Sequence, residues 1–310
     1  MRLLALTLLV LVPTGAAAQD GYPRPDRSVA FTFDDLPVVH ASSLADAQAI
    51  TTRLLEQIRA ARIPAIGFVN EGKLERPGET SARIALLEAW LAQGIDLGNH
   101  TYSHLRLQNT TVEAFEADIL KGERVIRPLM AAHGRPLRYF RHPTLSTGRD
   151  LATKTAVERF LTAHGYTVAP VTIDNDEYLY ALAYARARAR ADSVQMRQLG
   201  DDYVQYMAQV FGHWEELSRS LLGREPAQIL LLHANTLNAD WLRALAEMIR
   251  SRGYRFISLD QALEDPAYAL PDTYIRDYGP SWLERWAVTR GVDPGRMPPL
   301  PAWVAAASRQ

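Results

Sequence analysis

The stretch FTFDD (Phe31–Asp35) joins a buried strand pattern to two adjacent carboxylates. The run from Val29 to Phe33 is almost wholly apolar and predicts a strand. Aspartate is a poor strand former, and two neighbouring anions repel each other. The pair Asp34 and Asp35 therefore indicates chemistry at the end of this strand, and the structural alternative is a helix cap.

Outward from this strand, short apolar runs alternate with longer helical patterns. This alternation favours a parallel sheet. We predict an α/β fold, a distorted or incomplete (β/α) barrel of about seven parallel strands with a helical insertion and a C-terminal extension. The predicted strands are Val29–Phe33, Ala65–Val69, Ile95–Gly98, Leu137–Phe140, Tyr166–Ile173, Gln228–Leu232 and Arg255–Ser258. The predicted helices are Ser43–Ala61, Ser81–Ala92, Val112–Ala132, Arg149–Ala163 and Ala239–Arg250.

The composition narrows the class of protein. A chain of 310 residues with 47% hydrophobic content is long enough for one sizeable core. A net charge of −1 argues against a nucleic-acid partner. Because the chain has no cysteine, disulfides and thiolate metal ligands are excluded. The oligomeric state stays open.

The N-terminal residues have the pattern of a secretory signal peptide. Arg2 precedes an apolar run from Leu3 to Val12, and small residues follow up to Ala18. We expect residues 1–18 to be removed by cleavage near Ala18, which makes the protein periplasmic or secreted. The apolar run is too short to span a bilayer, and we expect no stable membrane anchor in the mature form.

Two later regions interrupt the alternation of strands and helices. Residues 178–222 are rich in alanine and arginine and predict an inserted helical pair. Residues 266–310 are rich in proline and aromatic residues and form a C-terminal extension that wraps the barrel or covers part of a cleft. We expect its tryptophans, Trp282, Trp286 and Trp303, to pack rather than to stack on sugars.

Titratable residues follow several of the predicted strands. In (β/α) barrels the catalytic groups gather at the carboxyl ends of the strands. The sequence therefore predicts one shared site at that edge. Its candidates are Asp34 and Asp35 after the first strand, His100 and His104 after the third, Arg141 after the fourth, Asp174 at the fifth and His233 after the sixth.

A metal ion would explain the adjacent aspartates. His100 and His104 are four residues apart and would share one face of a helical turn, although a polar helix face is the simpler reading. Two imidazoles and one carboxylate are a common open site for a hydrolytic metal. We assign Asp35, His100 and His104 as ligands of one divalent ion and Asp34 as general base. Zinc suits these ligands, and cobalt, nickel and manganese stay open.

Amide hydrolysis also needs a proton donor for the leaving amine. His233 ends an apolar strand and is the candidate acid, with a packed core histidine as the alternative. We expect Asp174 to hold the His233 ring and to favour its charged form. We expect Arg141 to pair with Asp34 and to keep that base ionised.

Taken together, these motifs resemble the polysaccharide deacetylases of carbohydrate esterase family 4, which share the NodB-homology domain. The resemblance runs from about Arg27 to Asp265 and implies a catalytic domain with those bounds. It implies base Asp34, metal ligands Asp35, His100 and His104, orienting Arg141 and acid His233. The motifs are Thr32–Asp35, His100–His104, Arg141–Pro143, Asp174–Tyr178 and Leu231–His233.

The chain departs from the family pattern at several positions. Leu36 stands where the family usually has glycine, and His142 and Thr144 replace a proline and an aromatic residue. The backbone amide of Thr144 can still stabilise an oxyanion, because that role needs no side chain. Glu177 and Tyr178 replace Asp-Trp, which makes Tyr178 the candidate for contact with the acetyl group.

The resemblance implies a metal-dependent hydrolase that removes acetyl groups. We expect N-acetyl removal from an exported acetylated glycan, such as peptidoglycan, a chitin-like chain or another N-acetylglucosamine polymer. An O-acetyl xylan esterase or a non-sugar amide hydrolase on the same framework is the first alternative. A carbohydrate-binding protein with a vestigial site is the second, and the complete set of acid, base and metal candidates argues against it.

Overall fold

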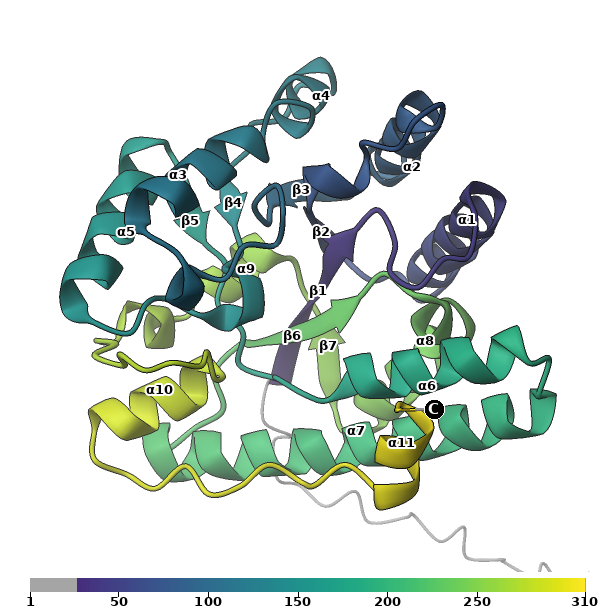
Figure 1. Ribbon diagram of the computed structural model, residues 1–310. Coiled ribbons are helices and arrows are strands. Elements are labelled where there is room, and N and C mark those ends of the chain that lie inside the picture. Colours follow the sequence, from purple (N-terminus) through teal and green to yellow (C-terminus); the bar gives the residue numbers. More distant parts are fainter. Residues whose placement is uncertain (1–26, 310) are drawn as a thin grey trace, which may run out of the picture.

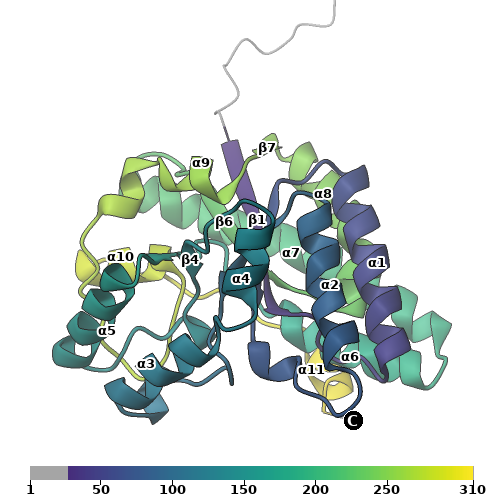
Figure 2. The ribbon, with the colours of Figure 1, turned by 90° about the horizontal axis from the view of Figure 1, so that it is seen from above.

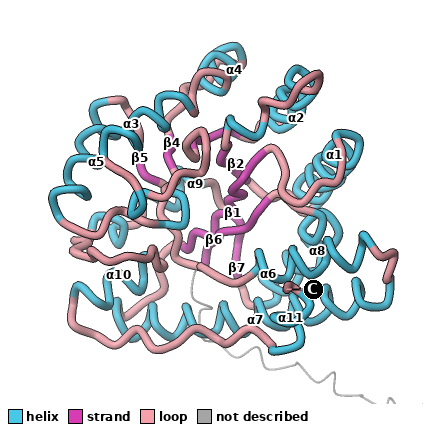
Figure 3. The backbone as a smooth tube through the Cα atoms, viewed as in Figure 1, coloured by secondary structure: helices cyan, strands magenta, loops and turns pink. Residues whose placement is uncertain are grey.

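The computed structural model describes residues 27–309, so the expected signal peptide lies outside the described residues. Its strands form one seven-stranded parallel sheet in the order β5-β4-β3-β2-β1-β6, with β7 paired to the start of β1. The sheet curls into a half-barrel surrounded by helices (Figures 1 and 3). The predicted distorted (β/α) barrel is confirmed.

The elements follow one another in the alternating order that the sequence predicts. The strands are β1 (Arg27–Leu36), β2 (Ala65–Val69), β3 (Asp96–Asn99), β4 (Tyr139–Phe140), β5 (Thr167–Val168), β6 (Gln228–His233) and β7 (Tyr254–Phe256). The α-helices are α1 (Leu44–Ala60), α2 (Thr80–Ala92), α3 (Val112–Lys121), α4 (Ile126–Ala132), α5 (Leu151–Ala163), α6 (Glu177–Ala189), α7 (Ser193–Leu222), α8 (Thr236–Ser251), α9 (Leu259–Leu263), α10 (Trp282–Thr289) and α11 (Ala302–Ala307). The 3₁₀ helices are η1 (Glu71–Lys73), η2 (Leu107–Asn109), η3 (Pro143–Leu145) and η4 (Pro266–Ala269).

Strand β1 lies inside the sheet and carries the aspartate pair at its carboxyl end. Its residues 28–34 are all buried, as expected for a parallel strand covered on both faces. It pairs in parallel with β2 and β6, and Asp34 lies opposite His233 in the β1–β6 register. The sheet itself therefore brings the predicted base and the predicted acid to one place.

The helices cover the sheet with amphipathic faces. Helix α1 begins at the N-cap Ser43, whose side chain accepts a hydrogen bond from the N–H of Asp46, and it buries Leu54 and Ile58. Helices α2, α1 and α8 pack side by side on one side of the sheet (Figure 2). In the core beneath them, the ring centroids of Phe33 and Trp90 lie 5.7 Å apart.

Two predicted elements differ from the structure by more than a shift of their ends. The single helix expected at Val112–Ala132 is divided into α3 and α4, with Gly122 at the C-cap of α3. A Cβ on Gly122 would lie 2.6 Å from the N atom of Tyr102, so glycine is needed where this turn approaches the loop after β3. The strand expected at Tyr166–Ile173 is reduced to β5, because Pro170 cannot donate to the ladder.

Residues 177–222 form the two long helices α6 and α7. Helix α7 ends at Gly223, which has φ 70° and forms a left-handed C-cap. After residue 265 the chain returns along these helices through α10 and α11 (Figure 1). Trp286 is buried and Trp282 is partly buried, as expected for packing residues, whereas Trp303 is 40% exposed.

Within residues 27–309, no helix has both the length and the apolar character needed to cross a membrane.

Candidate active site

The carboxyl ends of the strands open into one cavity of about 520 Å³. Eight of the nine predicted site residues line it: Asp34, Asp35, His100, His104, Thr144, Asp174, Tyr178 and His233. The ninth, Arg141, is fully buried and reaches the cavity through its ion pair with Asp34. The structure thus brings together residues that span 200 positions of the sequence.

Asp35, His100 and His104 form a cluster of the kind that holds a metal ion. One ligand atom from each residue lies within 4.8 Å of the other two. Asp35 Oδ1 is 3.8 Å from His100 Nε2 and 3.6 Å from His104 Nε2. Ligands bound at about 2.0–2.2 Å around a tetrahedral ion are themselves about 3.4 Å apart, so the distances from Asp35 to the two histidines are near those of a divalent metal site. Asp35 Oδ1 is buried, and among the described residues its nearest charged neighbour is Lys73, whose Nζ lies 3.3 Å away.

The protonation of His100 is set by its backbone partner. Its Nδ1 lies 2.7 Å from the carbonyl oxygen of Arg141, which can only accept, so Nδ1 carries the proton and Nε2 keeps its lone pair. Burial, together with the neighbouring His104, also holds the pKa of His100 well below its ordinary value. A neutral ring oriented through its second nitrogen is the usual state of a metal-binding histidine.

The loop that carries the two histidines is not the helical turn expected from their spacing. Residues 100–106, which follow β3, have no helical structure, and Thr101 and His104 have φ values of 62° and 57°. Two side-chain amides support this loop: Asn70 Nδ2 donates to the carbonyl oxygen of His100, and Asn99 Oδ1 accepts from the Thr101 N–H. Backbone strain that is held in place by its surroundings is common at functional sites.

Lys73 is the cation nearest to Asp35. Its Nζ lies 3.3 Å from Asp35 Oδ1 and donates to the Asp35 carbonyl oxygen at 3.0 Å. Burial alone would raise the pKa of the Asp35 carboxyl, but the charges of Lys73 and His104 bring it below its usual range. Asp35 is therefore a carboxylate at neutral pH, as a metal ligand must be.

Asp34 is buried beside a fully buried arginine. Arg141 Nη1 lies 3.5 Å from Asp34 Oδ2, as the sequence predicts. Arg141 Nη2 donates to Thr32 Oγ1 at 2.9 Å, and Thr32 in turn donates to the carbonyl oxygen of Leu230 at 2.8 Å. Burial raises the pKa of Asp34 to about 6 against the opposing effect of Arg141. Asp34 Oδ1 has no hydrogen-bond donor among the described residues.

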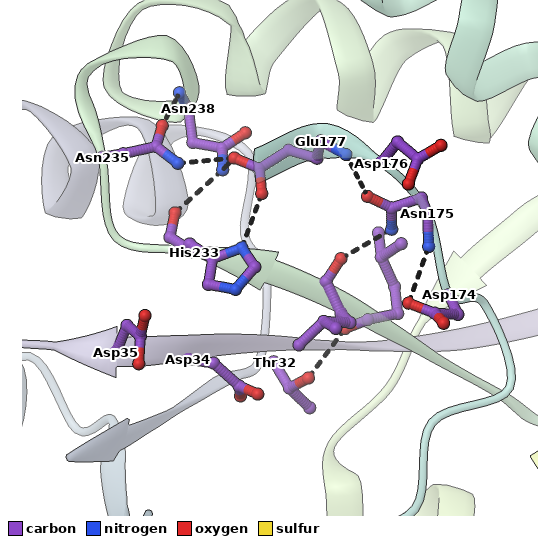
Figure 4. Close-up of polar contacts among 12 residues, drawn as sticks. Thr32, Asp34, Asp35, Asp174, Asn175, Asp176, Glu177, His233, Asn235 and Asn238 are labelled. Atoms are coloured by element: carbon purple, nitrogen blue, oxygen red, sulfur yellow. Dashed lines mark hydrogen bonds and ion pairs between the residues drawn. The ribbon is translucent and has the colours of Figure 1, made fainter. Parts of the chain in front are cut away.

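His233 is held by Glu177, not by Asp174 as we expected. His233 Nδ1 lies 2.7 Å from Glu177 Oε2, and Figure 4 shows the ring between Glu177 and the aspartate pair. Burial alone would lower the pKa of His233, but the Glu177 carboxylate raises it to about 9. Asp174 lies three residues before Glu177 in the chain. Its Oδ1 accepts a hydrogen bond from the Asn175 N–H at 2.9 Å. The reason for the difference is that Asn175 bonds to the β6 carbonyl of Leu231 and turns the chain, which brings Glu177 back over His233.

Glu177 is itself fixed from α8. Its Oε1 accepts hydrogen bonds from the side-chain amides of Asn235 and Asn238, the latter at 2.8 Å. Asn238 also donates to the carbonyl oxygen of His233. Glu177 is fully buried. The sequence did carry a signal for this residue. Glu177 stands at the fourth position of the motif Asp174–Tyr178, where the family pattern D-x-x-D-W has its second aspartate.

Glu177→Gln is expected to lower the pKa of His233, because glutamine keeps the shape of the side chain but removes the negative charge. An NMR titration of His233 should show its midpoint move from about 9 to near or below the ordinary value of 6.5. In the wild type, the stabilisation from the charged pair is complete below pH 6.5 and is lost as pH rises through about 9. The thermal-stability advantage of the wild type over the variant should therefore shrink across that interval.

Asp174→Asn is the matched control for this titration, since Asp174 was the residue expected from the sequence. It should leave the His233 midpoint near 9. Equal shifts in the two variants would contradict the assignment of Glu177.

Thr144 and Leu145, which also line the cavity, both adopt left-handed backbone conformations, with φ values of 52° and 54°. The N–H of Thr144 donates to no acceptor within residues 27–309. A free backbone donor in this wall is suited to an oxyanion.

The fold and the cluster together define an α/β half-barrel with a candidate hydrolytic metal centre at its strand ends. Residues 21–169 match the family model described as polysaccharide deacetylase. The chain therefore carries a polysaccharide deacetylase domain, the NodB-homology domain of carbohydrate esterase family 4, as its motifs indicate. The deacetylases of this family are hydrolases that act on acetylated polysaccharides and use a divalent metal.

Among curated proteins, the chain is similar to a peptidoglycan-N-acetylglucosamine deacetylase of Bacillus cereus. The two are 29% identical over 114 residues, which are 37% of this chain and 46% of the relative. The match thus spans less than half of that relative's length.

Among solved structures, the polysaccharide deacetylase Bc1974 from Bacillus cereus aligns with a TM-score of 0.50 and 17% identity, over 75% of this chain and 91% of that one. A mutant of BA3943, described as a CE4 family pseudoenzyme, aligns with a TM-score of 0.51 and 16% identity, over 78% of this chain and 68% of that one. The fold is shared by chains described as deacetylases and as pseudoenzymes. Whether a chain with this fold is catalytic therefore depends on its site residues.

Proposed function

We propose that the chain is a metal-dependent deacetylase that removes N-acetyl groups from an exported glycan. The observation that carries the proposal is the juxtaposition of a potential metal triad, Asp35, His100 and His104, with two further groups in one cavity. These are a buried Asp34, whose Oδ1 has no hydrogen-bond donor among the described residues, and a charged His233. A vestigial site would have no need to retain every one of these groups.

The donor set fits a divalent ion such as zinc, with cobalt, nickel and manganese as further candidates. The ionised carboxylate of Asp35 and the free Nε2 of His100 support this interpretation. Such an ion, when bound, supplies Lewis-acid polarisation of the acetyl carbonyl and lowers the pKa of a bound water.

Asp34 is the proton acceptor for the attacking water. With a pKa of about 6, it is ionised at neutral pH and is more basic than an exposed aspartate. The ion pair with Arg141 keeps its Oδ2 in place, while Oδ1 has no donor among the described residues and can accept the proton. This is a general-base role with a pKa close to the working pH.

His233 is the proton donor to the leaving amine. Its pKa of about 9 keeps it charged at neutral pH. Glu177 takes Nδ1, so the proton on Nε2 is the one directed to the substrate. The N–H of Thr144 donates to the carbonyl oxygen as negative charge develops on it.

The choice of an N-acetylated glycan is supported by the similarity to the Bacillus cereus enzyme and by the hydrogen-bonding side chains that line the cavity, such as Asp174, Asn175 and Asn235. Tyr178 is 50% exposed at the cavity wall, and its ring is suited to contact with the acetyl group or with a sugar. Asp174 adds a hydrogen-bonding group for a sugar hydroxyl. Export to the periplasm or medium after cleavage near Ala18 would place the enzyme with such a substrate.

We assign residues 27–265 to the catalytic domain, with residues 178–222 as a helical insertion and residues 266–310 as an extension. This division is supported by the position of Asp34, His100 and His233 in the first part, and by the run of α6 and α7 between β5 and β6.

The test is release of acetate from a panel of substrates: N-acetylglucosamine oligomers, peptidoglycan, acetylated xylan and a simple N-acetyl amide. We expect release from the N-acetylglucosamine substrates, loss of release with a chelator, and recovery on addition of zinc. Activity on xylan alone would change the substrate to an O-acetyl ester. If the zinc-loaded protein releases no acetate from any of these substrates but binds the oligomers, the result would indicate a carbohydrate-binding protein and not an enzyme.

A further inference from the structure

Arg285 is a fully buried arginine that belongs to the C-terminal extension yet bonds to the wall of the cavity. Its Nη2 donates to the carbonyl oxygen of Leu145, and its Nη1 donates to Thr147 Oγ1 at 2.8 Å. The guanidinium also stacks on Trp282, 4.3 Å from the ring centroid. Its charge is paired with Asp272, 3.3 Å from Nη1.

These contacts are made to residues 144–147, a segment with an unfavourable backbone conformation and few backbone hydrogen bonds. Thr144 and Leu145 are non-glycine residues with φ values of 52° and 54°, a conformation that is unfavourable for a residue with a Cβ. Such a conformation persists only where neighbouring groups determine it. In this segment the backbone bonds are the two short-range ones from Leu145 N–H to His142 and from Ser146 N–H to Pro143.

A second residue of the extension packs against the same segment. Gly279 lies so close that a Cβ there would be 2.2 Å from the carbonyl carbon of Leu145 and 2.3 Å from the carbonyl oxygen of Thr144. Gly279 also lines the cavity together with Thr144 and Leu145. The extension is therefore part of the cavity wall.

We propose that Arg285 is a positioning residue for deacetylation: it clamps residues 144–147 so that the Thr144 N–H faces the acetyl oxygen. The inference rests on the proposed function for its chemical consequence, while the clamping itself is a property of the fold. Arginine suits this role because its planar fork holds several donors in fixed directions and can bond a carbonyl, a hydroxyl and a carboxylate at once, whereas the three donors of lysine sit on one rotating nitrogen. The C-terminal extension then contributes to transition-state stabilisation through Arg285, although Arg285 itself does not line the cavity.

The first test is Arg285→Met, which keeps the apolar stem and removes the fork. Removal of one oxyanion donor costs about 10²–10³ in kcat, and a displaced donor should cost about 10–10². We expect that loss in kcat with KM and zinc affinity unchanged. Arg290→Met is the matched control, because Arg290 in the same extension donates to the carbonyl oxygen of Leu221 at 2.7 Å, away from the cavity. It should keep the wild-type kcat.

The second readout does not depend on activity. Hydrogen–deuterium exchange of peptides covering residues 141–150 should be faster in Arg285→Met than in the wild type and unchanged in Arg290→Met. If the wild type releases no acetate, the proposed function fails, and the exchange comparison still decides whether Arg285 clamps the segment. Unchanged exchange in a folded Arg285→Met protein, or equal kcat in the two variants, would overturn the inference.

Gly279→Ala tests the same wall if Arg285→Met does not fold. The added Cβ should displace the segment and lower kcat, again with faster exchange in residues 141–150. Gly212→Ala is the matched control, since a Cβ there meets only a side-chain nitrogen of Arg252 at 3.6 Å. Wild-type kcat and exchange in Gly279→Ala would contradict the proposal.

Discussion

Asp34→Asn is expected to lower kcat by about 10²–10⁴-fold, the range for loss of a general base. Asparagine keeps the shape of the side chain but cannot accept the proton of the attacking water. Zinc affinity should be retained, because the metal ligands are Asp35, His100 and His104. Steady-state kinetics and calorimetric zinc titration on the same preparation would separate the two effects.

Asp96→Asn is the matched control for this substitution. Asp96 begins β3 and pairs with Arg135 at 2.9 Å, at the end of the strand opposite the cavity. It should leave both kcat and zinc affinity near the wild-type values. Wild-type kcat in Asp34→Asn would remove Asp34 from the role of base.

His104→Ala is expected to weaken zinc binding by more than about 100-fold, since even substitution of groups that orient metal ligands costs about 10–100-fold in affinity. His104 is the better choice of the two histidines for substitution, because its side chain is 32% exposed whereas that of His100 is 2% exposed. The fold should therefore survive the change. Competition with a chromogenic chelator measures the affinity, and acetate release should fall in parallel.

His133→Ala controls for the loss of a histidine as such. His133 is exposed at the C-cap of α4, outside the cavity, and its removal should change neither zinc affinity nor activity. If His104→Ala and His133→Ala bound zinc equally well, the metal centre would not be the one described here.

The strand ends were the most predictable part of the molecule. Alternating apolar and helical segments predict the parallel sheet, and in such a sheet the carboxyl ends of all strands meet at one edge. Asp34 and His233 are therefore neighbours for a topological reason, although they are almost 200 residues apart in the sequence. The ion pair between Arg141 and Asp34 follows from the same geometry and agrees with the structure.

Loop paths and breaks in regular elements were less predictable. Helical spacing suggested that His100 and His104 share a helix face, but the loop reaches a similar side-by-side arrangement through positive φ values. The partner of His233 depends on how Asn175 turns the chain after β5, which sequence proximity to the strand does not reveal. Gly122 and its close approach to the histidine loop are likewise set by tertiary packing.

The individual contacts of the C-terminal extension with the site could not be predicted. Nothing in the proline-rich and aromatic composition of residues 266–310 identifies Arg285 as a bond donor to Leu145, because that contact spans 140 positions and depends on the packed path of the extension. The sequence predicted an extension that wraps the barrel or covers part of a cleft, and its residues Gly279 and Met297 line the cavity.

The central claim is tested most directly by X-ray diffraction at the zinc edge from crystals of the zinc-loaded protein. We predict one strong anomalous peak in contact with a carboxylate oxygen of Asp35 and with Nε2 of His100 and of His104, with Asp34 outside the ligand sphere. A peak bound elsewhere, or these three side chains turned apart around no ion in ample zinc, would contradict the account.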